Sequence, residues 1–195
     1  TRADGSGIAG GGDFSDGGDA GGAARTLGNT DSNDLSFITN NAAAITIQAA
    51  TGIVDFPLQS AASVYANGAQ TLTTSTVTKI QFNTEDYDTQ NEFDNVTNYR
   101  FTATEAGNYL VIITASTQAL GDGVYLDCFI YKNGASHIRT RASTGLSTDV
   151  QSLVSKIIPL AATDYIEGFV LHSHGSDRNL APEAHLGHFT ISKLD

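Results

Sequence analysis

The chain of 195 residues has no tryptophan and no methionine, a single cysteine, and only 16% charged residues. With Cys128 alone, no disulfide can form within the chain, and apolar neighbours such as Leu126 and Phe129 predict a buried thiol rather than a reactive one. The lack of tryptophan disfavours an aromatic-lined groove for cleaving polysaccharides. No apolar run approaches the roughly 18 residues of a membrane-spanning helix, so we expect no membrane insertion.

Positive charge is also scarce. Ten Lys and Arg residues stand against 21 Asp and Glu, which gives a formal net charge of −11. Sequence-independent binding of nucleic acid requires many cations to neutralise phosphates, and an anionic membrane surface attracts basic segments. Both kinds of partner are therefore disfavoured, and an acidic surface of a soluble protein is the simplest interpretation.

Residues 1–26 are rich in glycine and aspartate and offer almost no apolar surface to offset the entropy of ordering them. We expect a Gly-rich acidic arm that acts as a linker or is held by neighbouring chains. Thr1 is neither an initiator methionine nor the start of a signal peptide, so we expect the chain to begin after processing or inside a longer polypeptide.

Residues 27–60 show short alternating patterns: Leu35 and Phe37, then residues 44–47, then residues 53–56 before Pro57. The turn signals Asn40-Asn41 and Thr51-Gly52 separate them, which predicts two or three strands too short to enclose a core. The order of residues 33–56 resembles the small β-units of phage tail fibres and related trimeric adhesins. That resemblance implies a neck in which three chains bury together what one chain cannot.

Residues 61–195 form the main domain, in which short strand patterns alternate with turn signals and no convincing amphipathic helix appears. This is typical of a β-sandwich. The predicted strands are residues 62–65, 78–82, 99–103, 109–117, 124–131, 137–141, 150–160, 164–172 and 185–192. Asn133-Gly134 predicts a tight hairpin, because Asn-Gly tolerates the positive φ of a type I′ turn.

Four motifs in this domain resemble the complement C1q-like domain family. The first, in residues 87–111, places a loop with Phe93 before Tyr99-Arg100-Phe101-Thr102-Ala103 and a Gly107-Asn108-Tyr109 strand start. The others are the Lys-Asn-Gly hairpin at residues 132–134, residues 160–167, and the last strand at residues 185–194. Two departures are Thr163, where the family usually has glycine, and a glycine missing from the last motif.

The C1q-like resemblance implies an all-β C1q/TNF-type jelly-roll head of ten strands that assembles as a homotrimer and serves recognition rather than bond chemistry. Aromatic and basic side chains dominate binding surfaces. The residues that we predict to contact a receptor are Tyr87, Lys132, His137, Arg139 and Arg141. The alternative is that they are ordinary strand residues.

Two groups of residues have metal-binding chemistry. His172 and His174 share one face of a strand, and with His185 and His188 they form a possible zinc site; the alternative is that these histidines are solvated at a polar loop tip or packed at subunit contacts. Asp86, Asp88 and Asp94 form a possible calcium loop, but the EF-hand spacing is absent and a solvated acidic loop is the alternative. No other cofactor is expected.

No catalytic motif is complete. Gly5-Ser6-Gly7-Ile8-Ala9-Gly10 fits the dinucleotide fingerprint by chance, because no strand precedes it. A nucleophile elbow is also missing. We therefore expect a non-enzymatic trimeric head of a fibre or spike of a phage or similar particle, tethered to other virion proteins by its arm and binding a host-surface glycan or protein. The alternatives are a secreted C1q/TNF-like ligand of a protein receptor and, third, a carbohydrate-active enzyme on a fibre.

Overall fold

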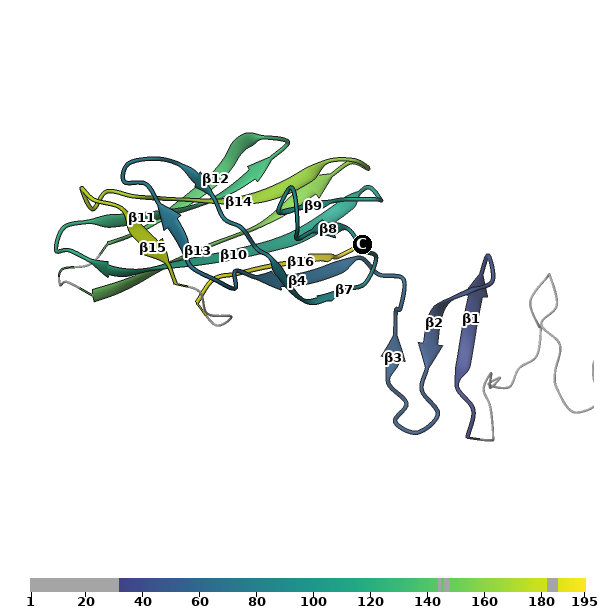
Figure 1. The fold of residues 1–195 in the computed structure, drawn as a ribbon. Helices are drawn as coiled ribbons and strands as arrows, with labels where there is room; N and C mark the ends of the chain where they lie inside the picture. The colour runs from purple at the N-terminus through teal and green to yellow at the C-terminus, as the bar shows by residue number, and fades with distance from the viewer. Residues whose placement is uncertain (1–31, 144, 146–147, 182–185) are drawn as a thin grey trace, which may run out of the picture.

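The computed structural model describes residues 32–143, 145, 148–181 and 186–195. These residues form sixteen β-strands and no helix, and hence no helix that is long and apolar enough to cross a membrane. The all-β prediction is confirmed. Figure 1 shows an elongated two-layered head and, beside one end of it, a small separate sheet. The Gly-rich arm lies outside the described residues.

The small sheet, which we call the neck sheet, is an antiparallel meander in the order β1-β2-β3. Its strands are β1 (Leu35–Thr39), β2 (Ala42–Ile47) and β3 (Val54–Asp55). Asn40 and Asn41 have φ values of 49° and 61°, which is the left-handed backbone of a tight hairpin turn. The predicted short strands of this region are therefore present.

The first sheet of the head, sheet I, has seven strands. The order across it is β13-β10-β16-β4-β7, and β15 and β5 continue it beside the far end of β10. The bounds are β4 (Ala61–Tyr65), β5 (Gln70–Leu72), β7 (Thr84–Asp88), β10 (Gly107–Leu120), β13 (Thr148–Leu160), β15 (Arg178–Leu180) and β16 (His188–Lys193).

The second sheet, sheet II, has six strands in the order β12-β11-β14-β9-β8, and β6 also pairs with β14. The bounds are β6 (Thr78–Lys79), β8 (Phe93–Asp94), β9 (Arg100–Thr102), β11 (Tyr125–Lys132), β12 (Ala135–Ser143) and β14 (Tyr165–His172). Asn133 and Gly134 join β11 to β12 with φ values of 52° and 76°, so the Asn-Gly hairpin prediction is confirmed.

The core lies between the two sheets and is made by alternate residues of the long strands. Phe93 and Phe82 meet Phe189 edge to face, with ring centroids 5.2 Å and 5.8 Å apart. Phe101 lies 5.7 Å from the ring of Tyr109. Three aromatic residues of the C1q-like signature, Phe93, Phe101 and Tyr109, therefore lie in the centre of the sandwich.

Four strands of the head were not predicted: β5, β7, β8 and β15. The predicted strand at residues 78–82 forms ladder pairs only at Thr78 and Lys79, although Ile80 and Phe82 are buried in the core. Cys128 is fully buried, as predicted, and burial raises the pKa of its thiol to about 12.

Candidate recognition surface

The outward face of sheet II carries a ladder of aromatic side chains. On β11 the even-numbered residues point into the core, so the odd-numbered ones point outward, and β14 alternates in the same way. Register places Phe129 directly opposite Phe169. The ring of Tyr131 lies 4.1 Å from that of Phe169 and 6.1 Å from that of Phe129, so these three rings form one continuous strip.

A cation lies over a ring at four places on this face. The guanidinium carbon of Arg141 is 3.6 Å from the ring centre of Tyr125, and that of Arg100 is 4.3 Å from Tyr165. The other two pairs, at 5.9 Å each, are Arg139 with Phe129 and Lys79 with Phe169. Cation–π contacts hold long side chains in place, so this face presents ordered positive groups.

Asp127 organises the arginine end of the face. Its side chain is only 1% exposed, and both of its oxygens accept hydrogen bonds from Arg141, at 2.7 Å from Nε and 2.9 Å from Nη2. This bidentate pair raises the pKa of Arg141 further, mainly through the hydrogen bond to Asp127. Arg139 reaches the same carboxylate only at 3.4 Å, so one buried anion serves two guanidinium groups.

The hairpin end of the face holds Lys132 and His137. The Lys132 ammonium lies 2.9 Å from a carboxylate oxygen of Asp164 and donates to the carbonyl of Pro159 at 2.7 Å. His137 is exposed on β12, and its pKa is lowered first by partial desolvation and then by the charges of Lys156 and Lys132. The basic residues predicted from the sequence are therefore brought together on β11 and β12.

Tyr87 is not part of this surface. It is half exposed, at 48%, on β7 in sheet I, and it pairs with Ser63 of β4. The outward face of sheet I also leaves Leu153 and Ile157 of β13 exposed, each at 53%. The predicted contact residues thus divide between two different surfaces of the head.

Comparison with solved structures identifies the fold. The globular domain of zebrafish complement 1qA matches with a TM-score of 0.55 at 16% identity, over 70% of this chain and 98% of that chain. Murine APRIL matches with a TM-score of 0.56 at 11% identity, over 70% and 99%. Eiger TNF from S. frugiperda matches with a TM-score of 0.53 at 13% identity, over 70% and 93%. The fold is a C1q/TNF-type jelly roll. No family model and no curated protein matches the chain.

The described histidines of the predicted zinc site do not converge. His172 is fully buried and its Nε2 lies 3.0 Å from the Leu72 carbonyl, while His188 on sheet I lies 2.9 Å from the Thr114 hydroxyl. His174 instead contacts Ser176 and Arg178. His185 lies outside the described residues, and among those described no group of three or more His, Cys, Asp or Glu side chains could hold a metal ion.

The three aspartates of the predicted calcium loop shape the backbone. Asp94 accepts hydrogen bonds from the backbone N–H groups of Val96, Thr97 and Asn98, which lower its pKa to about 2. Asp88 accepts from the N–H of Phe93 at 2.7 Å, and Asp86 from the Ser63 hydroxyl at 2.9 Å. Each of the three carboxylates thus already accepts at least one hydrogen bond from the jelly roll itself.

The surface features that the sequence did not predict are the aromatic strip and its two buried carboxylates, Asp127 and Glu167. Glu167 is 6% exposed and forms an ion pair with Lys79. The alternation of β11 and β14 could have indicated the strip, because the outward aromatic residues of each strand are spaced by two or four residues and so share one face. The partners of the carboxylates depend on strand pairing, which the sequence did not specify.

Proposed function

We propose that this chain is the recognition head of a homotrimeric, non-enzymatic fibre or spike on a phage or similar particle, displayed on the virion surface and binding a host-surface glycan or protein. The observation that supports it is the outward face of sheet I. On β13 both Leu153 and Ile157 are 53% exposed, and neither is covered by a described part of the chain. Exposed apolar patches on an otherwise folded domain are typical of association sites.

Association of identical chains fits this face. Half-buried Leu110 and Ile112 of β10 lie beside β13 on the same outward face. In a ring of three copies the exposed apolar residues of β13 can be covered by neighbouring chains, and closed rotational symmetry is the usual arrangement of homo-oligomers. The outward face of sheet II would then stay open, with its aromatic strip and the guanidinium groups of Arg100 and Arg141 available for a receptor.

The neck sheet supports the fibre context. Its exposed apolar residues include Phe37, Ile38 and Val54. A three-stranded sheet with an uncovered apolar face is marginal alone and needs a partner layer. Three weak receptor sites held on one particle would gain avidity on a repetitive host surface.

Molar mass in solution tests the assembly. We expect light scattering to give about three times the 20.4 kDa chain mass, and the double variant Leu153→Lys/Ile157→Lys to give monomers. The matched control is Val96→Lys, because Val96 is 75% exposed at a turn of the other sheet. A native monomer at micromolar concentration would overturn the assembly.

Incubation with host-surface polysaccharide tests the recognition role. Binding without loss of polymer length supports a recognition head. Depolymerisation would instead indicate a fibre-borne enzyme.

A further inference from the structure

The two long sides of the jelly roll end in strands of opposite charge. Sheet I begins with β7 on one side and ends with β13 on the other. Sheet II ends with β12 on the side of β13, where the Thr140 hydroxyl donates to the Leu153 carbonyl at 2.7 Å. On the opposite side β8 adjoins β7 through the bond from the Phe93 N–H to Asp88. One side is thus β7 with β8, and the other is β12 with β13.

The β7 side is acidic. Glu85, Asp86 and Asp88 follow one another along this short strand, and Glu85 and Asp86 are exposed. Among the described residues no Lys or Arg forms an ion pair with any of the three; the hydrogen bonds of Asp86 and Asp88 come from a hydroxyl and from backbone N–H groups. We call these three residues the acidic edge. Its charge of about −3 is not neutralised within the described chain.

The β12–β13 side is basic. Lys156 of β13 is exposed and forms no ion pair among the described residues. Arg139 and Arg141 share the single negative charge of Asp127, and Arg141 binds both of its carboxylate oxygens. This group of three side chains therefore keeps one net positive charge. We call Lys156, Arg139 and the neighbouring His137 the basic edge. Lys156 and Arg139 make a local excess of positive charge on a chain of net charge −11, although Asp149, near the start of β13, is also exposed on this side.

We propose that the basic edge of one copy docks against the acidic edge of the next, so that the trimer closes head to tail around a ring. This inference rests on the trimer proposed above and names the residues that set its register. Because each copy carries both edges on opposite sides, the contact is heterologous: the surface that one copy offers differs from the surface that it meets. A two-fold contact would instead place like charges against each other along each edge.

The apolar residues and the charged edges contribute differently to this interface. Leu153 and Ile157 lie on the outward face of β13, and Lys156 lies on the opposite face of this same edge strand, so the apolar residues border the basic edge. The apolar residues supply most of the affinity, since burial is the main driving force of association. The charged edges select the orientation and exclude wrong registers, because opposed like charges are costly.

Charge reversal tests the pairing in the full chain. We expect Lys156→Glu and Glu85→Lys each to raise the concentration at which the trimer dissociates by about tenfold at low salt, because repulsion replaces attraction at every interface. Combining both changes in one chain restores the opposite charges and should recover most of the stability. The matched control is Asp122→Lys, which makes the same change of charge as Glu85→Lys at an exposed turn.

Crosslinking tests the geometry independently. Chains with Lys156→Cys and chains with Glu85→Cys are mixed, exchanged, and treated with a short bis-maleimide; Cys128 is fully buried and does not compete. We expect crosslinked dimers only in the mixture, and covalent trimers from the double-cysteine chain.

The outcomes separate this inference from the proposed function. A native trimer that neither charge reversal weakens, and whose mixed chains do not crosslink, overturns the edge pairing and leaves the trimer standing. A native monomer overturns both. Crosslinking of the Lys156→Cys chain with itself would show a two-fold contact and overturn the head-to-tail ring.

Discussion

Thr163 holds a backbone conformation that suits glycine better. It lies in the turn between β13 and β14 with a φ of 76°, where a β-branched side chain crowds its own backbone. The turn is nevertheless fixed: the Thr163 N–H donates to the Ala103 carbonyl at 2.8 Å, and the Asp164 carboxylate accepts from the Ala161 N–H at 2.9 Å. The strain is thus retained because neighbouring bonds over-determine the turn.

Replacing Thr163 with glycine should therefore stabilise the head. We expect Thr163→Gly to raise the free energy of unfolding by roughly 0.5–1 kcal/mol, because relief of the backbone strain exceeds the extra entropy of an unfolded glycine. Denaturant titration measures it. Thr163→Ala, which keeps the positive φ but loses the branch, should gain less. A less stable glycine variant would mean that the threonine side chain makes a contact worth more than the strain.

At this scale the sequence predicted what is local and missed what depends on pairing. The missing glycine at position 163 and the buried Cys128 were both visible in the chain itself. The burial of His172 was not, because its partner Leu72 lies 100 residues away in sequence. Two histidines spaced by two residues fit the pattern of a metal site even when one imidazole nitrogen is already hydrogen-bonded to a backbone carbonyl, as in His172.

Among the elements, the long strands could be predicted and the short ones could not. Strands β10, β11, β13 and β14 are long, and their apolar residues alternate often enough for the sequence alone to predict them. Strand β7 reads Thr-Glu-Asp-Tyr-Asp and resembles a loop, since edge strands are often charged and need only one neighbour. Strands β5, β8 and β15 span two or three residues each, so only their partners define them.

The turn after β8, which Asp94 stabilises, predicts how the stability of the head depends on pH. Its backbone N–H groups hold the pKa of Asp94 at about 2, below the ordinary 3.8. A depressed folded-state pKa stabilises the fold above about pH 4, and this contribution is lost as the pH falls towards 2. We expect Asp94→Asn to lower the melting temperature by about 2 °C at pH 6, and most of this difference to be lost by pH 2, where the folded-state carboxyl is about half protonated.

Thermal unfolding of both proteins across this pH range measures the difference. Asp122→Asn serves as the control, because Asp122 accepts no hydrogen bond from the described residues. A constant difference between native and Asp94→Asn protein from pH 6 to pH 2 would show that the carboxylate charge has no part in holding the turn.

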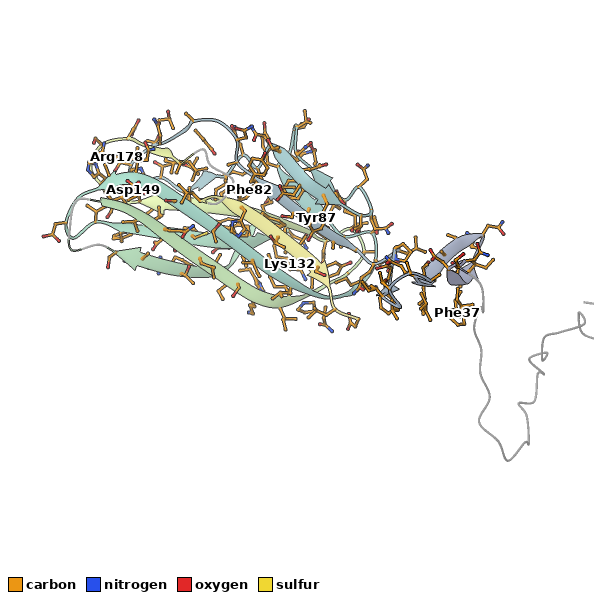
Figure 2. All side chains as sticks on the ribbon, turned by 90° about the horizontal axis from the view of Figure 1, so that it is seen from below. Phe37, Phe82, Tyr87, Lys132, Asp149 and Arg178 are labelled. Atoms are coloured by element: carbon orange, nitrogen blue, oxygen red, sulfur yellow. The ribbon has the colours of Figure 1, made fainter. Side chains whose placement is uncertain are left out.

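For the whole molecule, the head and the neck sheet depend on other chains to different degrees. Every residue of the buried core lies between Ala62 and Ile191, so the head encloses its own apolar interior. The neck sheet has no buried residue. Among the described residues no hydrogen bond joins its strands to the head; the nearest link is Gln59, which donates to the Lys193 carbonyl at 2.6 Å. Figure 2 shows Phe37 on the neck sheet, beyond the body of the head.

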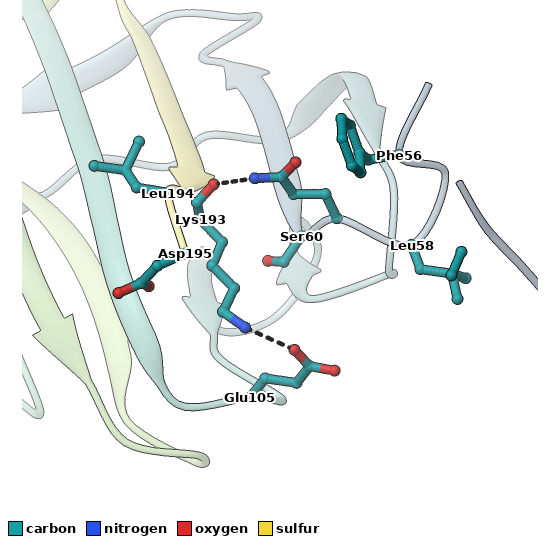
Figure 3. Close-up of a pocket in the computed structure, with 9 residues that line it drawn as sticks. Phe56, Leu58, Ser60, Glu105, Lys193, Leu194 and Asp195 are labelled. Atoms are coloured by element: carbon teal, nitrogen blue, oxygen red, sulfur yellow. Dashed lines mark hydrogen bonds and ion pairs between the residues drawn. The ribbon is translucent and has the colours of Figure 1, made fainter. Parts of the chain in front are cut away.

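The junction between the head and the neck sheet contains a hollow with exposed apolar residues. A hollow of about 510 Å³ is lined by Phe56 and Leu58 from the connection, by Leu194 just after β16, and by the ion pair between Lys193 and Glu105 (Figure 3). Phe56, Leu58 and Leu194 are about half exposed, at 53%, 46% and 50%. Apolar surface therefore continues from the neck sheet to the end of sheet I.

Removing the neck sheet should leave a folded head with a weaker trimer. We expect a chain that begins at Gln59 to keep the β-sheet spectrum of the head, because its core is complete. Its trimer should dissociate at a concentration about tenfold higher than that of the full chain, since three neck sheets tethered by short connections meet at a high effective concentration.

Sedimentation at several dilutions measures the dissociation. In the full chain, Phe37→Ser/Ile38→Ser should weaken the trimer in the same direction, whereas Ser36→Thr, on the polar face of β1, should not. Equal dissociation with and without the neck sheet would mean that its apolar face is covered by something other than two further copies of this chain.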